Sequence, residues 1–450
     1  MKFGQPSLHN YMDFEFFHEL LSIDSTSGKE RAAAEWLAER LPDMFPAANR
    51  PALQLQEVGD GTLNLLLAWG SPRLVFCSHI DTVPPYIAPK FSEDLLVSEP
   101  SLRDPSEDSF ASLGMTSPCP SEEDAAPMLS PRGSRPISPQ DKPSDPVSAG
   151  PSDDGRESFE SPVIRGRGSC DAKGQVFAII MACQKLAEEG CTDFGILLLA
   201  GEETGSWGAK AFAKTDFRAE YLVVGEPTDN CMVSASKGTK SFDLKFTGEP
   251  FHSGYPQHGV SAVDLFVQFV NKLKAKDFGT DPLLGETTWN IGLLKSDNPQ
   301  NILSPELTCR IYFRTTFVSD AAVTEWMAAA PDMMKDDRSE PAMAGIMSES
   351  AMTNDVISGQ PSHVIPGLTG NLTVTPRGGD TPARYWTVEG LPSKPVAFGS
   401  DAPHLTNFTH KAICGPGTVL VAHRADEHVL AADLATAVKQ YIDIYRSVTQ

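Results

Sequence analysis

The sequence lacks several features that would assign it at once to a common class of protein. No stretch approaches the roughly 20 consecutive apolar residues that a membrane-spanning helix needs, although 40% of the 450 residues are hydrophobic. Basic residues are scarce, since 37 Lys and Arg stand against 59 Asp and Glu, for a net charge of −22. Proteins that bind nucleic acid or an anionic membrane surface use basic clusters to contact the phosphates. We therefore expect neither nucleic acid nor a membrane as a partner.

Paired cysteines and a secretion signal are also missing from the sequence. The eight cysteines are scattered, and no two of them stand in a Cys-x-x-Cys pair. The first residues have no basic segment followed by an apolar run, which a signal peptide would have. These absences lead us to expect reduced thiols and a cytoplasmic location.

Short apolar runs alternate with helical periodicity over the first half of the chain. Strands are expected at 63–69, 74–77, 195–200 and 221–224, and helices within 11–41 and at 176–189 and 208–214. This alternation is typical of an α/β domain with a largely parallel sheet. Further along the chain, strands are expected at 240–246 and 307–315, and helices at 261–274 and 321–334. The later segment reads as a separate, smaller α+β domain.

These patterns predict a larger α/β domain of residues 1–228 and 379–450, with a smaller domain of residues 229–378 inserted into it. Two stretches interrupt the domains. Residues 98–162 include 15 Ser and 12 Pro among 65 residues. So few apolar side chains do not offset the entropy of ordering, and we expect a low-complexity insertion. A second insertion, at about 336–370, is rich in Ser, Met, Gly and Pro.

Five short motifs carry residues with useful chemistry, mostly just after expected strands. They contain His79 with Asp81, then Asp171, then Glu202 with Glu203, then Glu226, and finally His423. Taken singly, each has an ordinary explanation, such as a loop histidine, a helix cap at Asp171 or a solvated acidic loop. Taken together, they would converge where the carboxyl ends of parallel strands meet. Such a mixture of imidazoles and carboxylates suits zinc or cobalt, and two such ions need a bridging carboxylate.

In this order the motifs HIDTVPP, GRGSCDAKG, AGEETGS, VVGEPT and GPGTVLVAHRADEH resemble those of the co-catalytic zinc deacylases and exopeptidases. That family includes acetylornithine deacetylase, succinyl-diaminopimelate desuccinylase, aminoacylase-1 and carboxypeptidase G. The resemblance covers essentially the whole chain outside the two insertions. It implies a zinc-exopeptidase-like catalytic domain with a central mixed, mostly parallel sheet. It also implies that the smaller domain is a lid or dimerisation domain, and that the protein is a homodimer.

The resemblance assigns a role to each residue of the larger domain. It implies one metal ion held by His79 and Glu226, a second held by Glu203 and His423, Asp171 as the bridge between them, Asp81 as the residue that orients His79, and Glu202 as the general base. A cis peptide between Asp171 and Ala172 is part of the same family pattern. Cys170 reads as a buried small residue.

The resemblance extends to three residues of the smaller domain. His252, in the stretch GEPFHSG, would stabilise the oxyanion of the reaction. Asn301 and Arg314 would bind the substrate carboxylate or the scissile carbonyl, and a guanidinium fork suits a carboxylate. Arg314 is alternatively an ordinary charge on a strand surface. His404 is expected to be a pocket or loop residue rather than a metal ligand.

These features predict a zinc-dependent amidohydrolase with two Zn²⁺ or Co²⁺ ions that cleaves the amide bond of an N-acyl amino acid. The stretches GEPT and SDAPHL favour an acetylornithine deacetylase-like enzyme of arginine biosynthesis. A metallo-dipeptidase or carboxypeptidase on the same scaffold would use the same chemistry, and this alternative is left open. A more remote alternative is a metal-binding interaction protein without catalytic activity.

Overall fold

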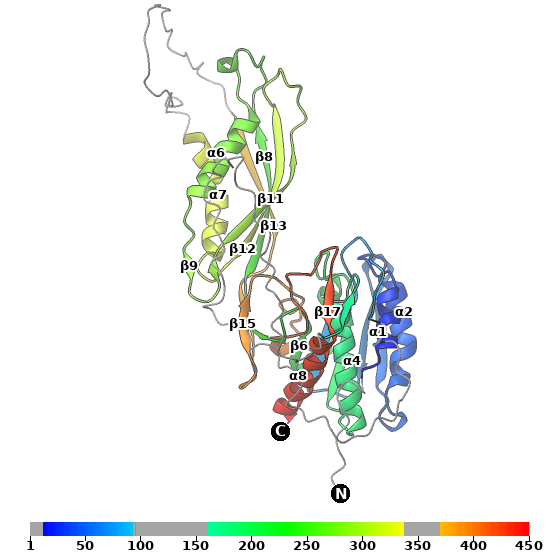
Figure 1. The fold of residues 1–450 in the computed structure, drawn as a ribbon. Helices are drawn as coiled ribbons and strands as arrows, with labels where there is room; N and C mark the ends of the chain where they lie inside the picture. The colour runs from blue at the N-terminus through cyan, green and yellow to red at the C-terminus, as the bar shows by residue number, and fades with distance from the viewer. Residues whose placement is uncertain (1–11, 93–94, 96–160, 337–369, 450) are drawn as a thin grey trace, which may run out of the picture. The chain divides into compact units, whose positions relative to one another are not determined.

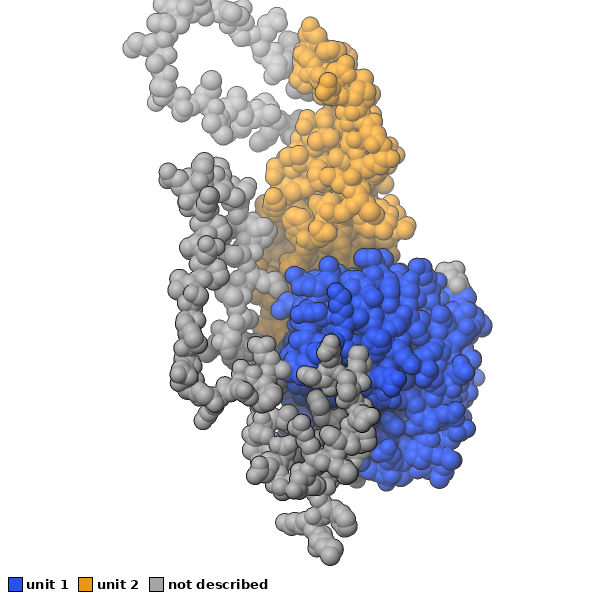
Figure 2. All heavy atoms as spheres, turned by 45° about the vertical axis from the view of Figure 1, so that its right-hand side comes forward, with its two compact units in different colours: residues 1–232, 386–394, 404–450 blue, residues 233–385, 395–403 orange. Residues whose placement is uncertain are grey.

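The computed structural model describes residues 12–92, 95, 161–336 and 370–449, and the predicted insertions fall almost entirely outside these ranges. The chain divides into two compact units, which Figure 2 colours separately. The first unit comprises Met1–Met232, Trp386–Lys394 and His404–Gln450, and the second comprises Val233–Tyr385 and Pro395–Pro403. The sequence places the corresponding boundaries at 228/229 and 378/379.

A six-stranded sheet in the order β1-β2-β5-β3-β6-β16 forms the centre of the first unit (Figure 1). The strands are β1 (Ala52–Val58), β2 (Thr62–Ala68), β3 (Leu74–His79), β5 (Phe194–Leu199), β6 (Ala219–Val224) and β16 (Phe408–Ile413). Strands β5, β3, β6 and β16 run parallel to one another, whereas β2 pairs antiparallel with both β5 and β1. The mixed, mostly parallel sheet is therefore confirmed, and the carboxyl ends of four strands share one edge.

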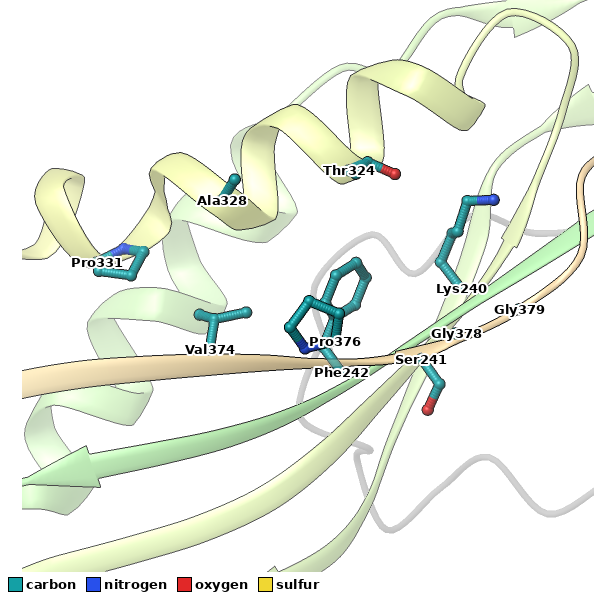
Figure 3. Close-up of a pocket in the computed structure, with 10 residues that line it drawn as sticks. All are labelled: Lys240, Ser241, Phe242, Thr324, Ala328, Pro331, Val374, Pro376, Gly378 and Gly379. Carbon is teal, nitrogen blue, oxygen red and sulfur yellow. The ribbon is translucent and has the colours of Figure 1, made fainter.

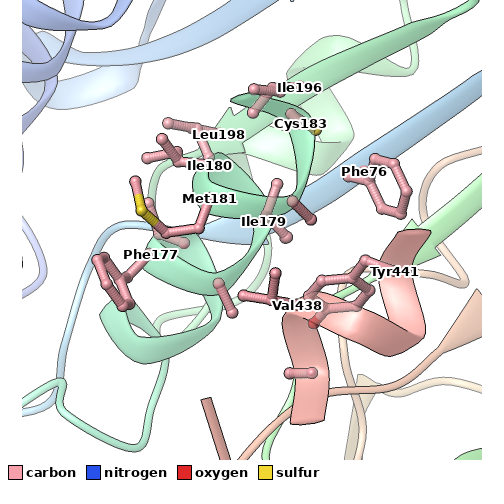
Figure 4. Close-up of a cluster of buried hydrophobic side chains, with 14 of the residues drawn as sticks. Phe76, Phe177, Ile179, Ile180, Met181, Cys183, Ile196, Leu198, Val438 and Tyr441 are labelled. Atoms are coloured by element: carbon pink, nitrogen blue, oxygen red, sulfur yellow. The ribbon is translucent and has the colours of Figure 1, made fainter. Parts of the chain in front are cut away.

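Helices cover this sheet and bury its central strands. They are α1 (Phe14–Ser22), α2 (Arg31–Arg40), α4 (Lys173–Glu188), α5 (Trp207–Phe212) and α8 (Ala431–Thr449), with short 3₁₀ helices η2 (Leu41–Met44), η3 (Ala47–Asn49) and η4 (Gly59–Gly61). Every residue of β2, β3 and β5 is buried, which is why these strands are mainly apolar. Figure 4 shows Tyr441 of α8 beside Phe76 of β3, with ring centroids 5.5 Å apart. The rings of Phe17 and Phe177 stack at 4.6 Å between α1 and α4.

A small two-stranded sheet lies in the same unit. It pairs β4 (Val163–Arg165) with β17 (His428–Leu430) in antiparallel fashion. Arg165 also forms a bridge with Lys90, in which each backbone N–H donates to the other residue's carbonyl at 2.9 and 3.0 Å. The bridge thus holds Lys90 and Arg165, which flank residues 91–164, next to each other.

The second unit is an α+β layer with its own core. Its antiparallel sheet has the order β11-β12-β8-β13, and helices α6 and α7 pack against one face. The elements are β8 (Gly238–Thr247), η5 (Pro256–His258), α6 (Ala262–Ala275), β9 (Thr280–Asp281), β10 (Gly285–Glu286), β11 (Thr288–Lys295), β12 (Glu306–Thr315), α7 (Asp320–Asp336) and β13 (Asn371–Gly378). Burial alternates along β12, as expected for a strand with one face on the core.

A three-stranded sheet in the order β14-β7-β15 contains two of the points at which the chain passes between the units, at 232/233 and at 394/395. Its strands are β7 (Met232–Ser236), β14 (Ala383–Arg384) and β15 (Ser393–Val396). The backbone N–H of Lys237 donates to the carbonyl of Val396 at 3.1 Å. This pairing explains why residues 395–403 return to the second unit, which the sequence does not predict.

Two expectations drawn from absences in the sequence have different outcomes. Within the described ranges, no helix has the length and apolarity to cross a membrane. Among the described cysteines, Cys77, Cys170, Cys183, Cys191, Cys309 and Cys414 form no disulfide. Cys231 is disulfide-bonded, so the prediction of reduced thiols is wrong for this residue. Cysteine spacing does not reveal which residues become neighbours in the fold. Cys119 lies outside the described residues.

Candidate metal centre

The predicted ligands of the first unit lie at the carboxyl edge of its parallel strands. Strand β3 ends at His79, Glu203 follows β5, and Glu226 follows β6. His423 is in the loop after β16, and Asp171 comes just before α4. Ligands bind at this edge in open parallel sheets because the loops that connect strands and helices meet there.

The ligand atoms form two groups that share Asp171. One group is His79, Asp171 and Glu226, the other is Asp171, Glu203 and His423, and in each the atoms lie within 4.8 Å of one another. Asp171 Oδ1 lies 3.2 Å from His79 Nε2, and its Oδ2 lies 3.4 Å from His423 Nε2. The Nε2 atom of His423 is also 3.1 Å from Glu203 Oε1. The two oxygens of one carboxylate therefore face different imidazoles, as a carboxylate between two cations would.

The electrostatics of these groups favour bound cations. Burial opposes protonation of His79, yet hydrogen bonds to Asp171 and Asp81 raise its pKa well above the ordinary value. Hydrogen bonds to Asp171 and Glu203 raise the pKa of His423 to about 10. The carboxylates thus hold positive charge at both imidazoles, and divalent ions at these atoms would supply that charge in place of protons. Imidazole nitrogens with carboxylate oxygens are a donor set that fits zinc or cobalt.

Asp81 is fully buried and connects two of the ligand loops. His79 Nδ1 lies 3.0 Å from the backbone carbonyl oxygen of Asp81 and 3.3 Å from its Oδ1. These two contacts turn the other ring nitrogen toward Asp171. The same carboxylate accepts the backbone N–H groups of Glu202 at 3.0 Å and Glu203 at 3.1 Å. Ser27 donates its hydroxyl to Asp81 Oδ2 at 2.9 Å. Asp81 therefore fixes both the orientation of His79 and the turn that carries the two glutamates.

The alternative that Asp171 is a helix cap is wrong. The N-cap of α4 is Ala172, which makes no side-chain capping bond, and the Asp171–Ala172 peptide bond is cis. Cys170 is buried beside them, and burial raises the pKa of its thiol well above the usual range. Its Sγ donates to the carbonyl of Thr418 at 3.4 Å, so it is a packed thiol.

Two glycines allow the loop of His423 to lie close to the other ligand loops. A Cβ on Gly415 would be 2.6 Å from the carbonyl oxygen of Glu226, and one on Gly417 would be 2.7 Å from Cys170 Sγ. Gly417 also has a φ of +75°. His423 itself has a φ of 64°, which is uncommon for a residue with a side chain and occurs where the surroundings fix the backbone.

The three predicted residues of the smaller domain lie in the second unit. His252 is exposed and pairs by an isolated bridge with Ile302, next to Asn301. The guanidinium of Arg314, on β12, lies 5.0 Å from the ring centre of Tyr312. The roles proposed for His252, Asn301 and Arg314 stay predictions. His404 is half-buried and belongs to neither donor group.

A pocket of about 450 Å³ in the second unit has a different character (Figure 3). Its lining is mainly apolar, with Phe242 and Pro376 from the sheet and Ala328 and Pro331 from α7. Lys240 is its one charged lining residue, and none of the predicted site residues lines it.

Three residues that support the metal ligands are not among the site residues predicted from the sequence. Ser27 donates to Asp81, and Arg167 and Glu427 form a buried ion pair under the Asp171 loop. Arg167 stands in the motif that contains Asp171, and Glu427 stands in the motif that contains His423. The position of Arg167 and Glu427 inside two of the motifs is the feature of the sequence from which their role could have been predicted.

Comparisons with known proteins bear on the fold of the chain. Residues 234–339 match the peptidase dimerisation domain of M20 type. The chain is 29% identical to a peptidase M20 domain-containing protein of Schizosaccharomyces pombe, over 63% of each sequence. It is 25% identical to a probable carboxypeptidase of Aspergillus clavatus, over 95% of this chain and 86% of the relative.

The solved structure of a Staphylococcus aureus tripeptidase has the same fold, with a TM-score of 0.62, 16% identity and 98% of each chain covered. The fold, with its dimerisation domain, is therefore that of the M20 peptidases. The chain spans less than two thirds of the length of the Schizosaccharomyces pombe relative.

The contacts of Asp81 lead to a testable prediction. In Asp81→Asn the side chain keeps its size but loses its charge, and its amide nitrogen no longer accepts hydrogen bonds. We expect zinc affinity, measured by calorimetry, to fall by about 10- to 100-fold, as for other partners of metal-bound histidines. Ser27→Ala removes only one of the contacts and should have a smaller effect. Equal zinc affinity in Asp81→Asn and the parent would show that the carboxylate of Asp81 is not needed to orient His79.

Proposed function

We propose that this chain, a relative of the M20 peptidases, is a metal-dependent hydrolase that cleaves the amide bond of an N-acyl amino acid or a short peptide. The observation that carries the proposal is the pair of donor groups that share Asp171. Zinc or cobalt would be held by His79 and Glu226 on one side, and by Glu203 and His423 on the other.

Bound metal ions at these residues would polarise the amide carbonyl and make a water molecule more acidic. Glu202 would be the base that accepts the proton from that water. It follows the same strand as Glu203 but belongs to neither donor group, and its charge acts on His79. Its backbone N–H is held by Asp81, which fixes the start of its side chain. The same carboxyl group would then donate the proton to the departing nitrogen.

Two substrate classes fit this chemistry. The motifs favour an N-acyl amino acid, with acetylornithine as the first candidate. The relatives named as a carboxypeptidase and a tripeptidase favour short peptides. Either class presents a carboxylate, for which Arg314 is the proposed anchor, and an amide carbonyl, whose oxyanion His252 would stabilise. Asn301 would bind beside them.

A substrate panel tests the proposed function. The purified chain is freed of metal, reloaded with zinc or cobalt, and incubated with N-acetyl and N-succinyl amino acids and with di- and tripeptides. Release of ornithine or another amino acid from acyl derivatives alone would support a deacylase. Release from peptides alone would support a peptidase. No release from any compound by the metal-loaded chain would contradict both and favour a non-catalytic metal-binding protein.

The role of Glu202 gives a second prediction. Glu202→Ala removes the proposed base but no proposed metal ligand. We expect kcat on the best panel substrate to fall by more than about a thousandfold. Zinc content, measured by atomic emission, should stay at the parent's value. Near-normal turnover with zinc bound would show that another group transfers the proton. Thr204→Ala, a change at an exposed residue of the same turn, is the matched control.

We also propose that the protein is a homodimer formed through β11. The matched dimerisation domain contains this strand, which lies at one end of its sheet. Leu293 and Leu294 on β11 are 71% and 56% exposed. A sheet edge with exposed apolar side chains is suited to pairing with a second copy about a two-fold axis.

Charges on that edge should separate the subunits. We expect the double variant Leu293→Lys and Leu294→Lys to have half the parent's mass in light scattering, because two lysine pairs would face each other across the axis. Leu55→Lys, at a similarly exposed leucine on β1 of the other unit, should keep the parent's mass. A parent that is already monomeric at micromolar concentration would contradict the proposal.

A further inference from the structure

We propose that the buried ion pair of Arg167 and Glu427 positions Asp171 between the two donor groups. Both would then be positioning residues, acting through the backbone of the ligand loops rather than on the substrate. The inference rests on the proposed function, because it assumes that Asp171 binds metal. Neither Arg167 nor Glu427 takes part in the chemistry proposed above, and the inference gives both of them a role.

Glu427 holds the backbone of the loop that leads to Asp171. Its Oε1 accepts the N–H groups of Gly168 at 2.9 Å, Cys170 at 3.1 Å and Asp171 at 3.1 Å. Its own carbonyl accepts the N–H of Gly166 at 3.1 Å. Charge-assisted bonds of this kind are stronger than those between neutral groups, so several donors on one oxygen fix the course of the loop.

Arg167 completes the arrangement from the other side. Its Nη1 donates to Glu427 Oε2 at 2.5 Å, and the two side chains are 2% and 0% exposed. Its Nε donates to the carbonyl of Pro85 at 3.2 Å, and its backbone N–H donates to the carbonyl of Ile87 at 3.0 Å. Pro85 and Ile87 belong to the segment that follows His79 in the chain.

The pair therefore joins three ligand loops. Arg167 stands four residues before Asp171 and contacts the segment after His79, and Glu427 stands four residues after His423. Glu203 and Glu226, by contrast, are on loops that the pair does not contact through any bond described above. Loss of the pair should consequently disturb Asp171, which belongs to both donor groups, more than these two ligands.

A positioning role has to be separated from a purely structural one. Removing one partner of a buried ion pair leaves the other charge buried without compensation and commonly destabilises a fold strongly. A structural role alone would lower the melting temperature but leave the metal affinity and kcat of the folded molecules unchanged. A positioning role would also change those two quantities, well below the melting temperature.

The experiment compares three variants with a matched control. Glu427→Gln keeps the shape and removes the charge, Glu427→Asp keeps the charge on a shorter side chain, and Arg167→Lys keeps the charge without the planar fork. The control is Asp320→Asn, which breaks the 3.0 Å ion pair of Lys240 and Asp320 in the second unit. Zinc binding to the metal-free chain is measured by calorimetry, folding by circular dichroism, and kcat and KM on the best panel substrate.

We expect Glu427→Gln to bind zinc about 10- to 100-fold more weakly, in line with other residues that orient metal ligands. Its kcat at saturating zinc should fall by at least about tenfold, with KM within about threefold of the parent, because the substrate contacts are unchanged. Glu427→Asp should recover part of both losses. Asp320→Asn should match the parent in zinc affinity and kcat.

Folded Glu427→Gln with the parent's zinc affinity and kcat would overturn the inference. Where Glu427→Gln does not fold, Arg167→Lys decides by the same two measurements. A parent chain that binds no zinc would overturn the proposed function, and this inference with it. Tight zinc binding by the parent and by all three variants would overturn this inference but leave the proposed function intact.

Discussion

Buried carboxylates that accept backbone N–H groups hold the centre together. A carboxylate removed from water costs free energy unless hydrogen bonds and positive charge compensate it. Asp81 obtains this compensation from His79 and from the turn of Glu202 and Glu203. Glu427 obtains it from Arg167 and from the loop of Asp171, so each carboxylate fixes the loops that satisfy it.

This constraint explains why the ligand loops need particular residues, whereas the strands beneath them need only apolar ones. Strands β3 and β5 bury apolar side chains on both faces and end at one edge of the sheet. Many sequences would build such strands, since burial requires only apolar residues of suitable size. The loops above them need particular polar groups, namely Asp81 and Glu427 as acceptors. Polar groups at the sheet edge, rather than the apolar core, thus distinguish this chain from other α/β domains.

The sequence predicts the parts of the fold that local patterns encode. The apolar run at β3 and the motif at its end together place His79 where the structure has it. Strand β1, in contrast, is mostly exposed and has no continuous apolar run, so pattern analysis misses it. The contact of Arg167 with Glu427 joins residues 260 positions apart, and no local pattern encodes such a pairing. The substrate-binding and oxyanion roles proposed for residues of the second unit, such as Arg314, depend only on the resemblance to the zinc deacylases and exopeptidases.

The bridge between Lys90 and Arg165 has a consequence for how the chain changes in evolution. His79 and Asp171 are 92 positions apart in the sequence, yet their side chains lie 3.2 Å apart. Because the bridge closes the chain on both sides of this segment, an insertion or deletion between Lys90 and β4 only lengthens or shortens an already closed loop. In polymer terms the closure entropy grows with the logarithm of loop length, so that doubling the length costs about 0.6 kcal/mol. Residues can therefore be gained or lost between two proposed metal ligands at little thermodynamic expense.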